Sequence, residues 1–198
     1  MVLMKSSVPY RRRNNLYNIK ISDVMQEVGG CMLQLVEGAR DREGRVVLLV
    51  QPQNYTPAAS PPLNVVRAVM YLLDKAQEDV EVQRKGFTVL VDGTGSKYSN
   101  FDPKMPRVLL DGIISRYPAR IGYTIITNMP WFFRFVWAVI RPLLSEKLAQ
   151  RFHIVTADKL VEFIPPDRLL PTYGGNLHYD HRAWIRKQHE NEGLPYSG

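Results

Sequence analysis

The sequence predicts an α/β fold, a largely parallel open sheet with helices packed on it. Apolar runs of β-branched character alternate along the chain with segments of helical spacing, which is the pattern of an α/β layer. The run FTVLV at 87–91 is continuously apolar, as in a strand that is buried on both faces. A length of 198 residues, 45% of them hydrophobic, suits one globular domain. We therefore expect one sheet whose parallel strands are joined by right-handed crossovers.

The first part of the chain is expected to precede the main domain. Residues 1–30 are predicted to form a basic N-terminal arm, extended or frayed over its first 20 residues. A short helix is expected at 21–28, with Ser22 as its N-cap. Residues 31–198 then form the domain proper, with no repeat and no second domain.

The elements of this domain follow from its apolar pattern. A charged loop joins two β-branched runs, which we expect to pair as antiparallel strands. Asp102 and Pro103 are suited to the cap and the first position of a helix. The predicted strands are 31–36, 45–50, 87–91, 123–127 and 152–155, and the predicted helices are 63–84, one beginning at 103, 131–144, a basic helix after it, 157–164, 166–170 and 184–189.

The predicted helix at 131–144 is unusually apolar. Only Arg134, Arg141 and Pro142 interrupt its aromatic and aliphatic residues, whereas a surface helix has one apolar stripe. The segment is too short to span a bilayer, which needs about 20 residues. It is either a fully buried core helix or a helix that covers a cavity or contacts a membrane.

Positive charge around this helix favours the second interpretation. Residues 116–151 contain six basic residues and one acid, in a chain of formal net charge +7. Apolar surface beside positive charge suits a lipid with an anionic headgroup. Nucleic acid is the other common partner of basic proteins. The sequence contains no recognisable nucleic-acid-binding motif, so we expect no nucleic-acid partner.

No pattern of catalytic or metal-binding residues is found. The sequence VDGTGSK at 91–97 lacks the spacing of a phosphate-binding loop. Cys31 lies in an apolar run and is expected to be a small core residue. The pair His178 and His181 has no further ligand nearby. We therefore predict no enzyme, no metal and no cofactor other than a bound lipid. A single cysteine and no secretion signal indicate the cytoplasm.

Several motifs occur together in a specific order. They are Tyr117-Pro118, Asn128-x-Pro130, the aromatic helix, Pro142-x-Leu144, a basic helix and Leu170-Pro171-x-Tyr173-Gly174-Gly175. With these motifs, residues 31–184 resemble the CRAL-TRIO lipid-binding family. The resemblance implies an apolar cavity for a lipid and a mobile lid helix over it, here residues 131–143.

The resemblance also implies site residues. Basic residues in positions similar to those of phosphoinositide-binding members are Arg120, Lys147 and Arg151, the last two spaced to share a helix face. Two departures are Ala119, where some members have a carboxylate, and the apolar 87–91 strand, where phosphatidylcholine binders can have hydroxyl residues. The residues expected in the cavity and lid are Val89, Val91, Ile125, Trp131, Phe132, Phe133, Phe135, Val136, Trp137 and Ile140.

Two functional hypotheses remain open. The first is a domain that binds a hydrophobic lipid, with a phosphoinositide or another anionic phospholipid expected, and with lipid transfer as an extension of that role. It would be cytoplasmic and peripheral on organelle membranes. The second is a protein-interaction or membrane-targeting module with the same fold and no exchangeable lipid. Residues 71–151 also resemble the lipid-binding domain that precedes the catalytic domain in megakaryocyte-type non-receptor tyrosine phosphatases, so a fused or associated signalling domain is a predicted partner.

Overall fold

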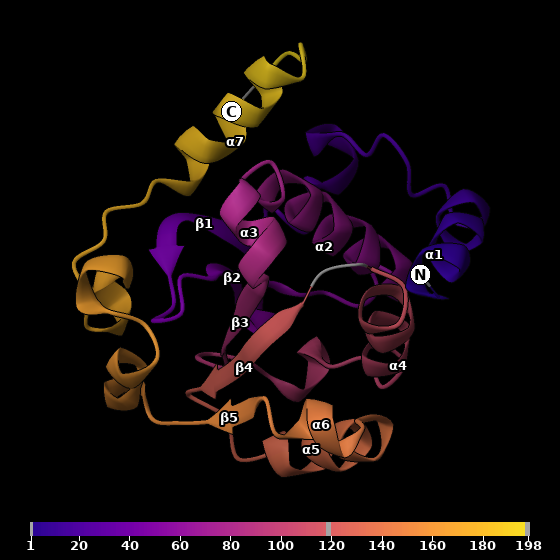
Figure 1. The fold of residues 1–198 in the computed structure, drawn as a ribbon. Coiled ribbons are helices and arrows are strands. Elements are labelled where there is room, and N and C mark those ends of the chain that lie inside the picture. Colours follow the sequence, from indigo (N-terminus) through magenta and orange to yellow (C-terminus); the bar gives the residue numbers. More distant parts are fainter. Residues whose placement is uncertain (1, 118–119, 197–198) are drawn as a thin grey trace.

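A five-stranded sheet forms the centre of the protein (Figure 1). The computed structural model describes residues 2–117 and 120–196; Pro118 and Ala119, named above, lie outside them. The first two strands are antiparallel and the other neighbours are parallel, so the predicted largely parallel open sheet is confirmed. In spatial order the strands are β1 (Leu33–Arg40), β2 (Val46–Val50), β3 (Phe87–Asp92), β4 (Ile121–Thr127) and β5 (Phe152–Ile154).

Most of the predicted helices are present, with shifted ends. The predicted helix at 63–84 is two helices, because Asp79 accepts a hydrogen bond from the Glu81 N–H at 2.8 Å and thereby caps a new helix. The α-helices of the described residues are α1 (Val2–Arg13), α2 (Pro62–Ala76), α3 (Val80–Lys85), α4 (Met105–Leu109), α5 (Phe133–Ile140), α6 (Glu146–Ala149) and α7 (His181–Asn191).

The connecting helices cover one face of the sheet. Strands β2 to β5 follow one another in chain order, and right-handed crossovers then place all their helices on the same side. Helix α2 packs there with most of its apolar residues buried. The segment after β5 crosses to the opposite face, where Leu160, Ile164 and Leu169 are buried against Leu90 and its neighbours (Figure 1).

The expected extended N-terminal arm is wrong. Residues 2–13 form α1, and the Arg11 guanidinium pairs with Asp74 of α2 at 3.1 Å and lies over the Tyr117 ring. Leu16, just after α1, is fully buried. The next helix is a single 3₁₀ turn, Ile21–Val24, which follows Lys20 as its cap in place of Ser22. Arg11 thus packs on the domain, whereas Arg12 and Arg13 are exposed.

Cys31 is also placed differently from the prediction. It precedes β1 in a turn with a left-handed backbone (φ 59°) and is only half-buried. Burial raises the pKa of its thiol. The strand begins two residues later than the apolar run suggested, which leaves Cys31 outside the core.

An irregularity in β4 decides which of its side chains face the helices. Ile121 is paired with Phe87, but Thr124 is paired with Val89, so β4 contains one extra residue between these pairs. The alternation of side chains is therefore reversed after the bulge. Glycine is required at position 122 because a Cβ there would collide with the Arg45 side chain.

A buried carboxylate holds the carboxyl edge of the sheet together. Asp92 is 3% exposed and accepts hydrogen bonds from Tyr173 on the opposite face (2.8 Å), from the Thr94 hydroxyl (2.7 Å) and from the Asn128 amide (3.0 Å). Asn128 has a left-handed backbone (φ 52°) and begins the loop that leads to α5. Burial alone would raise the pKa of this carboxyl, but the hydrogen bonds from Asn128, Thr94 and Tyr173 outweigh it and hold the pKa below its ordinary value.

The first prediction concerns this carboxylate. Asp92→Asn should lower the free energy of unfolding at pH 7 by about 2 kcal/mol, because hydrogen bonds to a charged acceptor are lost. Because the pKa of Asp92 is lower in the native state than in the unfolded state, where it is about 3.9, the charged carboxylate stabilises the fold above that pH. This stabilisation is lost as the pH falls through the native pKa. The difference between wild type and variant in urea titrations should therefore shrink below about pH 4.

The control is Asp167→Asn, at an exposed carboxylate, which should change stability by less than about 0.5 kcal/mol. A difference between wild type and Asp92→Asn that stays constant from pH 7 to about pH 3 would contradict the assignment to the charged carboxylate.

Candidate functional site: an apolar cavity under helix α5

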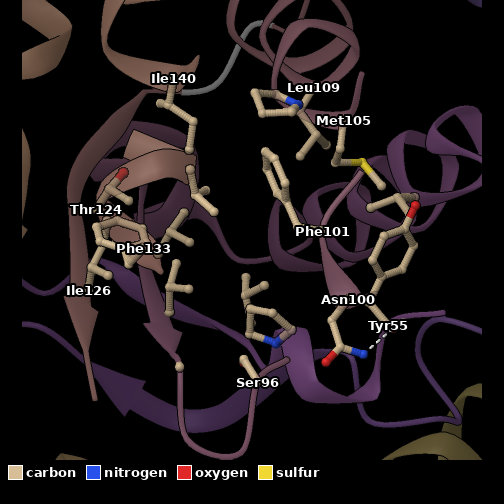
Figure 2. A pocket seen from close by; sticks show the side chains of 18 of the residues that line it. Tyr55, Ser96, Asn100, Phe101, Met105, Leu109, Thr124, Ile126, Phe133 and Ile140 are labelled. Carbon is tan, nitrogen blue, oxygen red and sulfur yellow. Dashed lines mark hydrogen bonds between the residues drawn. The ribbon is translucent and has the colours of Figure 1, made fainter. Parts of the chain in front are cut away.

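A cavity of about 340 Å³ lies between the helical face of the sheet, α4 and α5. This volume is at the lower end of the range for ligand pockets, roughly 300 to 1,000 Å³. Figure 2 shows Ile126 and Phe133 on one side of it and Phe101, Met105 and Leu109 on the other. The strand residues in its wall are Leu33, Leu48, Val50, Phe87, Val89, Val91, Ile121, Thr124, Ile126 and Phe152.

Helix α5 has two apolar faces. Phe133, Val136 and Ile140 face the cavity, and Phe132, which precedes the helix, lines it too. On the outer side, Trp131 is 78% exposed and Phe135 is 50% exposed, four residues apart and therefore on the same face. No residue of Phe133–Ile140 is buried. The interpretation of this segment as a fully buried core helix is therefore wrong.

The structure divides the ten expected cavity and lid residues into two groups. Six of them line the cavity: Val89, Val91, Phe132, Phe133, Val136 and Ile140. That they contact a lipid stays a prediction. The other four do not line it: Trp131 and Phe135 point outward, Trp137 packs on Phe152 with ring centroids 5.6 Å apart, and Ile125 is buried on the opposite face of the sheet.

The β4 bulge explains the misplaced Ile125. The residues of β4 that stand opposite Val89 and Val91 are Thr124 and Ile126, and these line the cavity. Sequence reasoning also missed the wall supplied by α4 and its flanks, including Met105 and Leu109. The apolar stripe of that segment was the signal that could have found it.

The three predicted headgroup residues lie outside the cavity wall. Arg120 is exposed and precedes β4, and its carbonyl accepts a hydrogen bond from the Phe87 N–H at 2.9 Å. Arg151 precedes β5 and donates from its guanidinium to the carbonyl of Ile121, a residue of the cavity wall. Arg120 and Arg151 therefore come together at the amino edge of the sheet, beside one end of the cavity.

Lys147 is exposed in α6, and α6 ends at Ala149. Lys147 and Arg151 thus do not share a helix face, and the expectation that they do is wrong. The helix is shorter than predicted because β5 begins at Phe152, which leaves Arg151 in the connection.

These cations differ from others nearby in having no carboxylate partner. Arg116 pairs with Asp111 at 3.0 Å, and Arg141 pairs with Glu146. Within residues 2–117 and 120–196, no ion pair is made by Arg120, Lys147 or Arg151. Their uncompensated charge at the amino edge is available to an anion.

The other end of the cavity is closed by the loop after β3. Asn100 donates to the Tyr55 carbonyl at 2.7 Å and accepts from the Lys97 N–H at 2.8 Å, which fixes the loop (Figure 2). Ser96, Lys97 and Asp102 contribute to the wall at this end. The cavity thus extends along the strands, from the loop at the carboxyl edge to the basic residues at the amino edge.

His181, one of the two histidines considered as metal ligands, is held by hydrogen bonds within the protein. His181 contacts the Tyr179 hydroxyl and the Val28 carbonyl, each at 2.8 Å, and burial lowers its pKa. The described residues contain no group of three or more His, Cys, Asp or Glu side chains that could hold a metal ion. None of their helices is both long enough and apolar enough to cross a membrane.

Comparison with known sequences places this site in a family. Residues 33–175 match the model of the CRAL/TRIO domain. Human clavesin-2 is 30% identical over 158 residues, which are 77% of this chain and 48% of clavesin-2, and clavesin-1 of Xenopus laevis is 30% identical over 153 residues. Human tyrosine-protein phosphatase non-receptor type 9 is 30% identical over 145 residues, 73% of this chain and 24% of the phosphatase. The chain spans about half the length of the clavesins and about a quarter of the phosphatase.

A solved structure has the same fold. The crystal structure of Sfh5 superposes with a TM-score of 0.61 and 17% sequence identity, covering 94% of this chain and 73% of that one. This likeness shows the fold. Together with the family match over residues 33–175, it leads to one conclusion: the chain belongs to the CRAL/TRIO domain family.

Proposed function

We propose that this domain binds one lipid in the cavity under α5 and transfers it between membranes, with a phosphoinositide or another anionic phospholipid as the ligand. One observation carries the proposal. The helix that walls the apolar cavity is apolar on its outer face too, and that face is exposed. A helix that covers acyl chains when closed and enters a membrane when open needs both faces apolar.

The energetics of a lipid tail suit this cavity. An acyl chain of about sixteen carbons costs about 12 kcal/mol to hold in water, at about 0.8 kcal/mol per CH₂. A carrier must therefore supply a continuous apolar wall, and strand residues such as Val89 and Val91 with Phe133 and Val136 of α5 supply one here.

The cavity volume supports a proposed movement of α5. About 340 Å³ is small for a lipid with two acyl chains, so such a ligand requires α5 to move outward. The helix has no buried residue to resist that movement. The Asn128–Asp92 hydrogen bond holds the loop before α5, and we therefore assign the hinge of the proposed movement to Met129 and Pro130.

The anionic headgroup is assigned to the amino edge of the sheet. Arg120, Lys147 and Arg151 make no ion pair in the described chain, and Arg151 contacts a residue of the cavity wall. An arginine guanidinium has the planar donor arrangement that phosphate oxygens accept. A phosphate bound here lies beside the cavity while its acyl chains occupy the interior.

The outer face of α5 is assigned to the membrane. Trp131, Phe135 and Val139 are spaced by four residues and are 78%, 50% and 39% exposed. Arg134 lies on the same helix and is exposed. Apolar side chains inserted into the membrane contribute to binding, and each basic residue near anionic lipids adds about 1 kcal/mol. Together they give reversible peripheral binding at the cytoplasmic surface of organelles.

The rival function is a protein-interaction or membrane-targeting module without exchangeable lipid. It uses the same exposed face of α5 and leaves the cavity without a ligand. Mass spectrometry of the protein after its separation from lipid vesicles distinguishes the two functions, because only a lipid carrier retains a bound lipid.

The second prediction tests the headgroup site. The variant Arg120→Ala/Lys147→Ala removes two exposed cations and leaves Arg151, whose guanidinium also supports the backbone. Affinity for dipalmitoyl phosphatidylinositol 4-phosphate should fall at least tenfold, since each charge-assisted contact contributes about 1.5 to 3 kcal/mol. Affinity for phosphatidylcholine, which has the same phosphodiester but no 4-phosphate, should fall less. Both are measured by displacement of one fluorescent lipid.

A charge-matched control is Arg84→Ala/Lys187→Ala, two exposed cations on other elements, which should leave both affinities unchanged. If the Arg120/Lys147 variant loses both lipids equally, the headgroup has been placed wrongly.

The third prediction tests membrane docking. Trp131→Ala/Phe135→Ala should weaken binding to vesicles that contain anionic lipid by at least tenfold, because each inserted side chain contributes about 1.5 to 3 kcal/mol. Wild-type binding should also weaken with salt, since exposed charges are screened over about 8 Å at physiological ionic strength. Vesicle sedimentation at several salt concentrations measures both effects.

The control for docking is Tyr17→Ala/Val80→Ala, which removes two other exposed apolar side chains, 45% and 57% exposed, and should bind vesicles as wild type does. Equal loss in both double variants would show that general apolar exposure, rather than α5, drives the association.

A further inference from the structure

Thr124 is a polar exception in the sheet wall of the cavity. All the other strand residues that line the cavity in the described chain are aliphatic or aromatic. Thr124 is 8% exposed, and its hydroxyl makes no hydrogen bond with the residues that the structure describes; unlike the fully buried Thr127 hydroxyl, it is open to the cavity. Figure 2 shows it on the α5 side of the cavity with Ile126 and Phe133.

The backbone of β4 turns this residue toward the cavity. The extra residue between the Phe87–Ile121 and Val89–Thr124 pairs reverses the alternation, so that Thr124 lines the cavity and Ile125 does not. Bulges occur preferentially beside functional sites, where they redirect a side chain. Without the bulge, Tyr123 and not Thr124 would stand opposite Val89 at this level.

An unpaired hydroxyl in this position calls for a partner. A lipid that fills the cavity would exclude water from this hydroxyl, and a polar group that is buried without a hydrogen-bond partner is costly. A water molecule would need two to four polar partners to be held there, and the wall strands beside Thr124 present Val89 and Phe152. An oxygen atom of the cavity's own ligand is a partner that the apolar wall itself does not provide.

The position of Thr124 along β4 determines which oxygen atom of the ligand lies within reach of its hydroxyl. Ile121, beside Arg120 and Arg151, pairs with Phe87, and Thr124 pairs with Val89, two residues further along β3. Two residues of a strand span about 7 Å. A glycerol unit separates a lipid phosphate from its ester carbonyls over a comparable length.

We propose that the Thr124 hydroxyl donates a hydrogen bond to an acyl-ester carbonyl of the bound lipid, and so selects ester-linked glycerophospholipids over their ether-linked counterparts. This inference rests on the proposed function, because it uses the phosphate position at Arg120 and Arg151 to set the depth of the ligand. Sites that hydrogen-bond a ligand oxygen discriminate strongly against analogues that lack it.

The test compares two lipids with the same headgroup and chain length. Dipalmitoyl phosphatidylinositol 4-phosphate and its dihexadecyl ether analogue are measured against wild type and Thr124→Val, which replaces the hydroxyl by a methyl group of similar size. Wild type should prefer the ester by about fivefold, the value of one neutral hydrogen bond. Thr124→Val should bind the ether as wild type does and lose the preference. Thr124→Ser, which keeps a hydroxyl, should retain it.

Thr127 provides a matched control on the same strand. It is also buried, its hydroxyl also lacks a partner in the described chain, and it does not line the cavity. Thr127→Val should keep the full ester preference.

An equal affinity of wild type for both lipids, or an unchanged preference in Thr124→Val, overturns the inference while lipid binding stands. If wild type binds neither lipid, the phosphoinositide function itself fails, and the inference fails with it.

Discussion

Right-handed crossovers between parallel strands are the constraint on which the rest of the structure depends. Because β2 to β5 follow one another in chain order, their helices must share one face of the sheet. Helix α2 packs on its part of that face with nine buried residues, whereas no residue of α5 itself is buried. The space that α5 leaves above the sheet is the cavity. Helix α5 is apolar but has water on one side and a cavity on the other, so it lacks packing contacts on both sides. Such a departure from close packing is expected at functional sites.

The two edges of the sheet have different physical roles around this cavity. At the carboxyl edge, Asp92 joins the opposite face, the loop after β3 and the start of the α5 loop through short hydrogen bonds. These hydrogen bonds hold that edge in place, and it is the fixed end in the proposed movement of α5. At the amino edge, Arg120 and Arg151 carry uncompensated charge near the cavity wall. The proposed lipid lies between them, with its phosphate at the charged edge and its apolar chains toward the closed end.

The sequence allowed the sheet and helix α5 to be predicted, but not the details that determine the cavity. Continuous apolar runs and helical spacing are local patterns, so β1 to β5 and the position of α5 followed from them. The reversal of alternation in β4 is set by its pairing with β3, and the Arg45 side chain lies against Gly122 within it, a long-range contact that no local pattern records. Ile125 was therefore expected in the cavity in place of Thr124. The packing of α1 depends in the same way on the distant Asp74, and the short α6 depends on where β5 pairs with β4.

Native mass spectrometry of the purified chain after incubation with vesicles tests the central claim most directly. The vesicles contain phosphatidylcholine and a minor fraction of phosphatidylinositol 4-phosphate, and the protein is separated from them before it is measured. The account predicts a species heavier than the bare chain by the mass of one lipid, enriched in the phosphorylated lipid relative to its fraction in the vesicles. A spectrum that contains only the bare chain would contradict lipid binding in the cavity, and one bound lipid without enrichment would contradict recognition of its headgroup.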